Sequence, residues 1–385
     1  MGMIYNSAVV TISATSSASG SDGLFNTIST SIFQRTSDLH VTVESEMSCG
    51  NKSTLYLGSH ELAATSLAAW QALMKNAPLL QRAWVAQERM SSRRIIHYTA
   101  TQMFWECEHC IASEDNALLS SDEYWTAGAR ILFINLYRST DLGGFRLSDE
   151  ELRSIWYIRF VERIYSRSKL TFANDKLVAI SGLAKLIHDK TNLPYYAGHW
   201  ACNEAWFLDS LRWARGSTGM KTREYRAPSW SWASQDSSIR FLGPSSDPDV
   251  QHLARIVKLF VVSQPPATNP FGRLAGGEIT IEGPLLACEL KHISYTCNDE
   301  MGIDATSARA DYHFLDDESA PPSGASAYAL ALRCGDTDSI VQYLLLNPAA
   351  ANPQTMKRIG IGLTHINLDW TQELLRAPVT SVRII

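Results

Sequence analysis

Short apolar runs and alternating positions predict strands in the first third of the chain. Residues 9–14 form a β-branched run with the composition of a buried strand. Residues 38–57 alternate weakly between apolar and polar side chains, which is typical of an edge hairpin. Residues 94–98 and 102–107 each have the length and pattern of a short strand. We therefore expect several strands before residue 110.

Helical patterns separate these strands. Residues 60–75 predict one helix and residues 78–90 a second. The second is expected to begin at Pro78, because proline is favoured at the first helical position. Residues 111–122 are polar and predict a loop.

The middle of the chain is predicted to be helical. Ser148 followed by Glu151 has the pattern of a capping box, in which each side chain bonds the backbone N–H of the other residue. Apolar positions then recur at helical spacing as far as Tyr165. Two more helices are expected over residues 176–189 and 202–214.

The last third of the chain has a different character. Glycine, proline and serine are frequent over residues 243–276. Strand-like runs are found at residues 254–262, 278–282, 328–333, 340–346 and 358–366. We therefore predict an α/β protein in three parts, with residues 1–110 mixed, 111–240 helical and 241–385 β-rich.

Composition excludes several classes of protein. With 385 residues, 45% of them hydrophobic, the chain can bury a substantial core. The formal net charge of -5 argues against a nucleic-acid binder, and no apolar run is long enough to span a membrane. Seven cysteines are too few for a disulfide scaffold, and no basic region followed by an apolar stretch marks a signal peptide. We expect a cytoplasmic location.

One pair of residues is a candidate for chemistry. Trp84 and Glu88 lie four apart in a predicted helix, so their side chains share one face. An indole beside a carboxylate can desolvate it and raise its pKa towards the range used in acid–base catalysis. The alternative is structural, with Trp84 in the core and Glu88 in an ion pair that orders the following turn. The expected partners of that ion pair are Arg82, Arg93 and Arg94.

Other motifs indicate little chemistry. The segment Cys107-Glu108-His109-Cys110 holds three potential metal ligands, but no second pair at a suitable spacing completes a tetrahedral site, so no metal is predicted. A phosphate-binding loop is absent from the sequence, and no cofactor is predicted. The alternating serines and tryptophans of residues 229–232 lack the glycines of a nucleophile elbow and are interpreted as packing.

Six segments form an ordered series along the chain. They are residues 3–14, 23–25, 82–107, 174–183, 196–200 and 227–234. The third is the most distinctive and contains Arg82-Ala83-Trp84, Gln87-Glu88, Ser92, Arg94 and Trp105-Glu106-Cys107. In this order and spacing, these signature segments resemble the fungal heterokaryon-incompatibility (HET) domain proteins.

The resemblance implies a role in non-self recognition and programmed cell death, exerted through protein partners or self-association. The family carries further strands, with a tryptophan-glycine motif, upstream of the segment that contains Ile4-Tyr5. Residues 1–110 are therefore expected to be the C-terminal half of a HET domain that is truncated at its N-terminus. An inactive remnant or scaffold is an alternative interpretation of such a truncation.

The resemblance also implies a possible enzymatic activity. HET domains are distantly similar to TIR domains, some of which cleave NAD. In those enzymes a glutamate follows a tryptophan by four residues on a helix, as Glu88 follows Trp84 here. By this analogy Glu88 would act as the nicotinamide bond breaks, with NAD as substrate, unless the truncation has removed the rest of the site.

Overall fold

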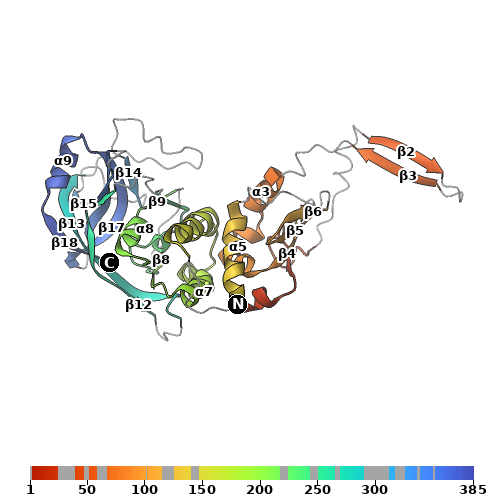
Figure 1. Ribbon diagram of the computed structural model, residues 1–385, viewed down its shortest axis with the longest axis horizontal. Helices are drawn as coiled ribbons and strands as arrows, with labels where there is room; N and C mark the ends of the chain where they lie inside the picture. Colours follow the sequence, from red (N-terminus) through yellow and green to blue (C-terminus); the bar gives the residue numbers. More distant parts are fainter. Residues whose placement is uncertain are drawn as a thin grey trace. The chain divides into compact units, whose positions relative to one another are not determined.

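A computed structural model of the chain has two compact units, Met1–Ile134 and Asn135–Ile385 (Figure 1). The residues described are 2–24, 40–46, 52–58, 67–100, 102–114, 125–139, 147–216, 224–242, 250–264, 269–289, 312–316, 326–335, 339–349 and 352–385. Helices and several sheets occur together, which confirms the mixed α/β class. The predicted three-part division at residues 110 and 240 stays a prediction.

A four-stranded sheet lies at the centre of the first unit, in the order β1-β4-β5-β6. Its strands are β1 (Thr11–Ser13), β4 (Arg94–Tyr98), β5 (Met103–Cys107) and β6 (Ile111–Ser113). β1 pairs with β4 in parallel, and the other pairs are antiparallel. The strands at 94–98 and 102–107 are confirmed. The loop predicted from residue 111 is wrong at its start, because a two-residue turn returns the chain directly into β6.

Helices surround this sheet. They are α1 (Gly2–Ser7), α3 (Leu67–Asn76), α4 (Ala83–Ser91) and the first part of α5 (Trp125–Arg138). Trp70 and Met74 of α3 pack against Phe104 and Ile111 of the sheet. This packing explains the helix predicted from the apolar pattern of residues 60–75.

The helix predicted over residues 78–90 is interrupted. Pro78 is followed by the short 3₁₀ turn η2 (Leu79–Gln81), and α4 begins only at Ala83. The break occurs because Arg82 has an extended backbone, with φ −84° and ψ 127°. Pro78 therefore precedes a single 3₁₀ turn, and α4, the helix that contains Trp84 and Glu88, is shorter than predicted.

The predicted hairpin is confirmed over β2 (His40–Glu46) and β3 (Lys52–Gly58), which pair antiparallel with one another (Figure 1). Its predicted position at the edge of a sheet is wrong, because the two strands form a separate two-stranded sheet among the described residues.

One helix of the second unit begins at the predicted capping box. Ser148 Oγ accepts a hydrogen bond from the N–H of Glu151 at 3.2 Å, and the Glu151 carboxylate accepts one from the N–H of Ser148 at 2.9 Å. The cap confirms the prediction and begins α6 (Asp149–Leu152), which continues as the π-helix η3 (Arg153–Tyr165). Trp156, Phe160 and Tyr165 of η3 are fully buried.

The two later helices are shorter than predicted. The helix expected from residue 176 begins at Ser181, as α7 (Ser181–Thr191), because 3₁₀ turns occupy the residues before it. Residues 202–214 form α8 (Glu204–Ser210), whose N-terminus is capped by the Asn203 side chain, and then the start of β9 (Trp213–Arg215). Short turns and strands complete this region. The 3₁₀ turns are η4 (Ala173–Asp175), η5 (Val178–Ile180) and η6 (Trp232–Ser234), and the strands are β7 (Tyr195–Tyr196), β8 (His199–Trp200) and β10 (Ile239–Phe241).

An eight-stranded sheet dominates the remainder of the second unit. Its strands are β11 (Gln251–His252), β12 (Arg255–Ser263), β13 (Leu274–Glu289), β14 (Tyr312–Leu315), β15 (Ser326–Cys334), β16 (Ile340–Ala349), β17 (Asn352–His365) and β18 (Val379–Ile384). The pairings return to their start, from β13 through β15, β16, β17 and β18 to β13 again, so these five strands close into a barrel. The predicted β-rich character is confirmed, but the helix α9 (Asp369–Arg376), whose Leu374 packs against buried residues of β15 and β16, was not predicted.

The serine–tryptophan segment of the second unit is a packing element, as expected. Trp232 Nε1 donates a hydrogen bond to the Gly198 carbonyl at 3.1 Å, and Ser231 Oγ donates to the Ala197 carbonyl at 2.6 Å. Ser229 Oγ accepts from the N–H of Arg358 in β17. Ser231 is fully buried, so its hydroxyl is held in the core and away from solvent.

Candidate functional site

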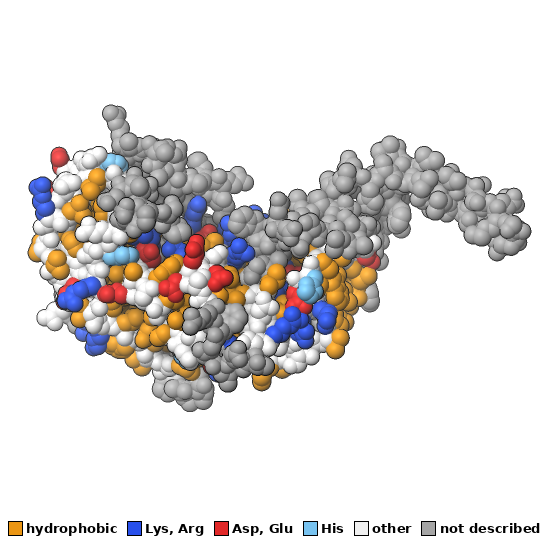
Figure 2. Space-filling model, viewed as in Figure 1, with side chains coloured by type: hydrophobic (Ala, Val, Ile, Leu, Met, Phe, Trp, Pro, Cys, Tyr) orange, Lys and Arg blue, Asp and Glu red, His pale blue; other side chains and the backbone are white. Residues whose placement is uncertain are grey.

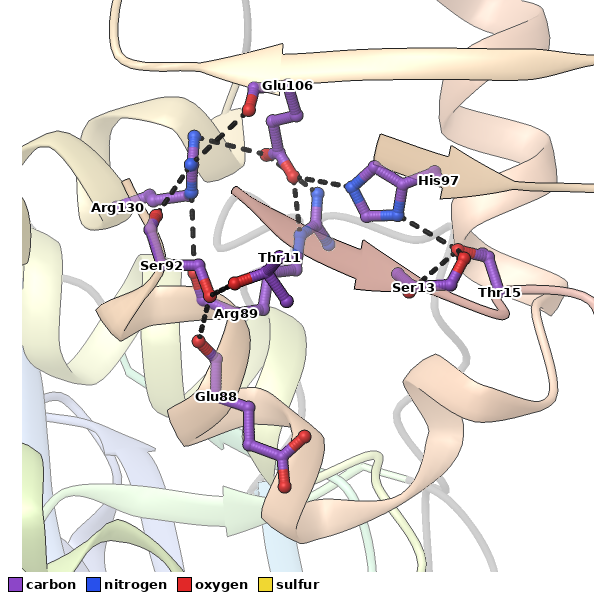
Figure 3. A network of polar contacts seen from close by, with 9 residues as sticks. All are labelled: Thr11, Ser13, Thr15, Glu88, Arg89, Ser92, His97, Glu106 and Arg130. Atoms are coloured by element: carbon purple, nitrogen blue, oxygen red, sulfur yellow. Dashed lines mark hydrogen bonds and ion pairs between the residues drawn. The ribbon is translucent and has the colours of Figure 1, made fainter. Parts of the chain in front are cut away.

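The predicted pair Trp84 and Glu88 lies on α4, and both side chains are partly buried. The hydroxyl of Tyr5, on α1, donates a hydrogen bond to the Glu88 carboxylate. Burial and this neighbouring negative charge raise the pKa of Tyr5 to about 12. Figure 3 shows the Glu88 carboxylate pointing away from the polar network described below.

The arginines expected to pair with Glu88 do not do so. Among the described residues no ion pair joins Glu88 to Arg82, Arg93 or Arg94. The structural interpretation is therefore wrong about the partner, because α1 brings a tyrosine to that face of α4.

A buried polar network lies on the other side of α4, with Glu106 of β5 at its centre (Figure 3). Arg89 Nε and Nη2 donate to the two carboxylate oxygens of Glu106, each at 3.0 Å. His97 Nε2 lies 2.9 Å from Glu106 Oε2. Two parallel N–H···O bonds between an arginine and a carboxylate are among the strongest pairings in proteins.

Arg130 of α5 connects this centre to the surrounding backbone. Its Nη2 donates to the Ser92 carbonyl at 2.6 Å, and its Nε donates to the Arg89 carbonyl at 3.3 Å. The same Nη2 lies 3.4 Å from the carbonyl of Glu106. One side chain thus donates hydrogen bonds to carbonyl groups of α4, β5 and the turn between α4 and β4.

A chain of hydroxyl groups leads away from the imidazole. Thr15 Oγ1 lies 2.9 Å from His97 Nδ1 and 2.9 Å from Ser13 Oγ. An ionised carboxylate can only accept hydrogen bonds, so we assign the proton of His97 to Nε2, facing Glu106. Nδ1 then accepts from Thr15, whose oxygen accepts from Ser13. The residue types match those of a hydrolase triad, but Thr15 and His97 are 1% and 0% exposed, which leaves no room for a substrate.

Burial and the charges within the network shift the pKa values of Glu106 and His97. Burial alone would raise the pKa of Glu106, but the positive charges of Arg89 and Arg130 and the hydrogen bond from His97 hold that pKa well below its ordinary value. Burial lowers the pKa of His97, and Glu106 offsets this effect only in part. The folded network therefore contains a carboxylate and a neutral imidazole.

We expect His97 to make the stability of the first unit depend on pH. Because its folded-state pKa lies below the ordinary 6.5, the unfolded chain binds the extra proton first as pH falls. The stability contributed by neutral His97 should be fully present above the ordinary pKa and should decrease as pH falls below it towards the lowered pKa of the folded state. Denaturant unfolding at several pH values measures the free energy of unfolding of the wild type and of His97→Gln. The difference between these two free energies should narrow as pH falls. A constant difference would contradict the prediction.

The sequence contains a signal for this network in the two strands that hold His97 and Glu106. In β4 and β5 the buried positions alternate, and His97 and Glu106 occupy buried positions beside Ile95 and Phe104. Histidine and glutamate at core positions of strands imply partners, since charged groups are almost never buried alone. The contribution of Arg130 had no such signal.

A cavity of about 510 Å³ lies in the second unit, and neither residue of the predicted pair lines it. Its walls include the aromatic side chains of Tyr225 and Phe260 and the cations Lys357 and Arg383. Arg383 forms an ion pair with Glu278, which also lines the cavity. The volume is in the range of small-molecule sites, and the mixed charges select neither an anion nor a cation.

The surface also bears on the partners that were predicted. On the described part of the face in Figure 2, acidic and basic side chains are interspersed among apolar ones, unlike the basic stripe of a nucleic-acid-binding protein. No helix within the described ranges is both long and apolar enough to cross a bilayer.

Comparison with known proteins supplies no further site. No family model, no curated protein and no solved structure matches the chain. The function must therefore be inferred from the residues themselves.

Proposed function

We propose that this chain is a HET-type protein of non-self recognition, which acts in the fungal cytoplasm and triggers cell death by associating with protein partners. The observation that carries the proposal is the ordered series of signature segments, together with the contacts among them. A series of segments that contact one another in the folded chain indicates a family more specifically than any single segment does.

In the first unit, one contact joins the segments 3–14 and 82–107, and further contacts lie within the segment 82–107. Thr11 Oγ1 lies 2.9 Å from Ser92 Oγ, and Ser92 Oγ donates to the Glu88 carbonyl at 2.8 Å (Figure 3). Glu106 receives both hydrogen bonds of Arg89. The hydroxyl groups of Thr11 and Ser92 thus link the two segments, and the other contacts order the segment 82–107 itself.

The same holds in the second unit. Trp232 of the last segment donates to the Gly198 carbonyl of the segment before it. Arg226 lies beside the last segment, and its guanidinium donates to the carbonyls of Ala233 at 2.7 Å and Ala173 at 3.4 Å. The segments 196–200 and 227–234 are therefore joined directly, and Arg226 links the last segment to Ala173, which precedes the segment 174–183.

The topology of the first unit supports a HET or TIR-like α/β domain. β1 and β4 are parallel neighbours, and the chain between them contains α3 and α4. A strand, helical crossover and parallel strand form the basic unit of α/β folds.

Association is favoured over catalysis by the burial of the ionisable groups. The described network around Glu106 is closed to solvent, and its charged groups are paired with one another. A second candidate, cleavage of NAD by Glu88, has one observation in its favour. The Glu88 carboxylate is only partly buried, and its partner Tyr5 is held in position by a hydrogen bond that a ribose hydroxyl could replace.

Glu88→Gln distinguishes the two functions when expressed in a fungal host beside the wild type. We expect growth arrest in at least one partner background with both proteins, because amide and carboxylate have the same shape and association does not need the charge. Nicotinamide release by the purified proteins is measured in parallel. If Glu88→Gln loses both growth arrest and nicotinamide release, the result favours cleavage of NAD by Glu88. If the wild type arrests growth in no background, the effector proposal fails and an inert scaffold remains.

A further inference from the structure

Two cysteine thiols lie beside each other where β5 passes into β6. Cys107 and Cys110 flank the two-residue turn Glu108-His109, and the N–H of Cys107 donates to the Cys110 carbonyl at 3.0 Å. Their Sγ atoms are 3.7 Å apart. Both are reduced and partly exposed, and His109 at the tip of the turn is exposed.

The backbone geometry suits a disulfide. Glu106 and Ile111 are opposite each other in the ladder, so Cys107 and Cys110 are the next facing pair. Facing residues in an antiparallel ladder have Cα atoms about 4.5–5.5 Å apart, within the range of about 4.4–6.8 Å found in disulfides. Side-chain rotation, without movement of the strands, therefore suffices to join the two sulfur atoms.

The two thiols differ in their acidity. Burial alone would raise the pKa of Cys107, but hydrogen bonds from the N–H of His109, at 3.4 Å from Sγ, and from neighbouring groups lower it. Burial and the adjacent Cys107 raise the pKa of Cys110. Cys107 is therefore the thiol that ionises first, and Cys110 retains its proton.

We propose that Cys107 and Cys110 form a reversible dithiol–disulfide pair that a peroxide oxidises, with Cys107 as the attacking sulfur and Cys110 as the resolving one. The Cys107 thiolate attacks one oxygen of hydrogen peroxide, the O–O bond breaks, and the leaving hydroxide takes a proton to become water. Cys110 then attacks the sulfur of the Cys107 sulfenic acid. An S–S bond forms, and the hydroxyl leaves as a second water with the Cys110 proton. Peroxide is reduced and the two thiols are oxidised.

The bond would act on the strand that carries the centre of the polar network. Cys107 directly follows Glu106, whose backbone carbonyl is contacted by Arg130. A ring closed over so few residues removes little entropy from the unfolded chain, so the effect on global stability should be small. The expected effect is local, at the end of the β5–β6 hairpin. This inference does not depend on the proposed function.

The full-length protein tests the proposal. After treatment with hydrogen peroxide and removal of the excess, peptide mass spectrometry should show the loss of two hydrogens in the peptide that contains Cys107 and Cys110, reversed by a dithiol reductant. Dimedone, which traps sulfenic acids, should label Cys107 in Cys110→Ser and should leave Cys110 unlabelled in Cys107→Ser. Cys202→Ser is the matched control and should oxidise as the wild type does.

Two results would overturn the inference. One is a wild-type peptide that keeps both thiols, or joins either of them to another cysteine, under conditions that oxidise glutathione. The other is stronger dimedone labelling of Cys110 in Cys107→Ser than of Cys107 in Cys110→Ser. That result would reverse the roles of the attacking and the resolving sulfur. The wild-type measurement decides the pairing even if a serine variant does not fold.

Discussion

Replacing Glu106 by leucine is expected to destabilise the first unit by about 3–5 kcal/mol, because Arg89 would be left buried without an anion. The guanidinium donates two hydrogen bonds to Glu106, and leucine accepts none. Hydrogen exchange of the amides in β4 and β5, followed by mass spectrometry in denaturant, reports the loss in this unit directly.

Glu88→Leu is the matched control for Glu106→Leu. It makes the same chemical change in the same unit, at a carboxylate that is only partly buried and hydrogen-bonded to Tyr5. Its cost should stay below about 1 kcal/mol, the usual effect of a substitution near the surface. Equal costs for the two variants would mean that the buried pair is not what holds the sheet and α4 together.

A double variant separates charge from packing. Replacing Glu106 by leucine and Arg89 by methionine removes both charges and keeps apolar volume in the same space. Substitution of a buried ion pair by apolar residues is often neutral or stabilising. We therefore expect the double variant to recover most of the stability lost in Glu106→Leu. A further loss would indicate that Arg89 also stabilises the unit through contacts other than the pair with Glu106, such as its position over the Trp70 ring.

Local patterns in the sequence predicted the elements whose cause is local. The capping box at Ser148 and Glu151 formed as expected, and the strands of the first unit followed their alternating residues. The helix at Pro78 failed for a reason that lies outside the segment. Arg82 is extended, and the N–H of Leu79 bonds the carbonyl of Thr15, far earlier in the chain.

The polar network shows the limit of local patterns more clearly. His97 and Glu106 are diagonal neighbours on one face because Glu106 pairs with Ile95 and His97 with Phe104, and a shift of one strand by one residue would put the two side chains on opposite faces. Arg130 comes from a helix that residues 94–107 do not predict. Sequence reasoning selected Glu88 on one face of α4, whereas the buried, strongly paired groups lie on the other.

Gly198→Ala is expected to destabilise the second unit by about 2–6 kcal/mol, from two causes that act together. Gly198 has φ +97°, a conformation that residues with a Cβ rarely adopt. A Cβ at this position would lie 2.6 Å from Trp232 Nε1 and 2.7 Å from Trp232 Cε2. Neither the turn between β7 and β8, which contains Gly198, nor the buried indole can move away without opening the core. Urea unfolding of the variant measures the cost.

Two further variants identify the cause. Gly276→Ala is the control, because a Cβ there meets no atom within 4 Å and its φ is not positive, so its cost should be below about 1 kcal/mol. Trp232→Phe provides a smaller ring beside Gly198 and also loses the hydrogen bond to its carbonyl. If the clash matters, the cost of Gly198→Ala should be smaller in the Trp232→Phe background than in the wild type. If Gly198→Ala costs the same free energy of unfolding in both backgrounds, the whole effect comes from the backbone conformation. The contact with Trp232 would then not explain why a glycine is required at position 198.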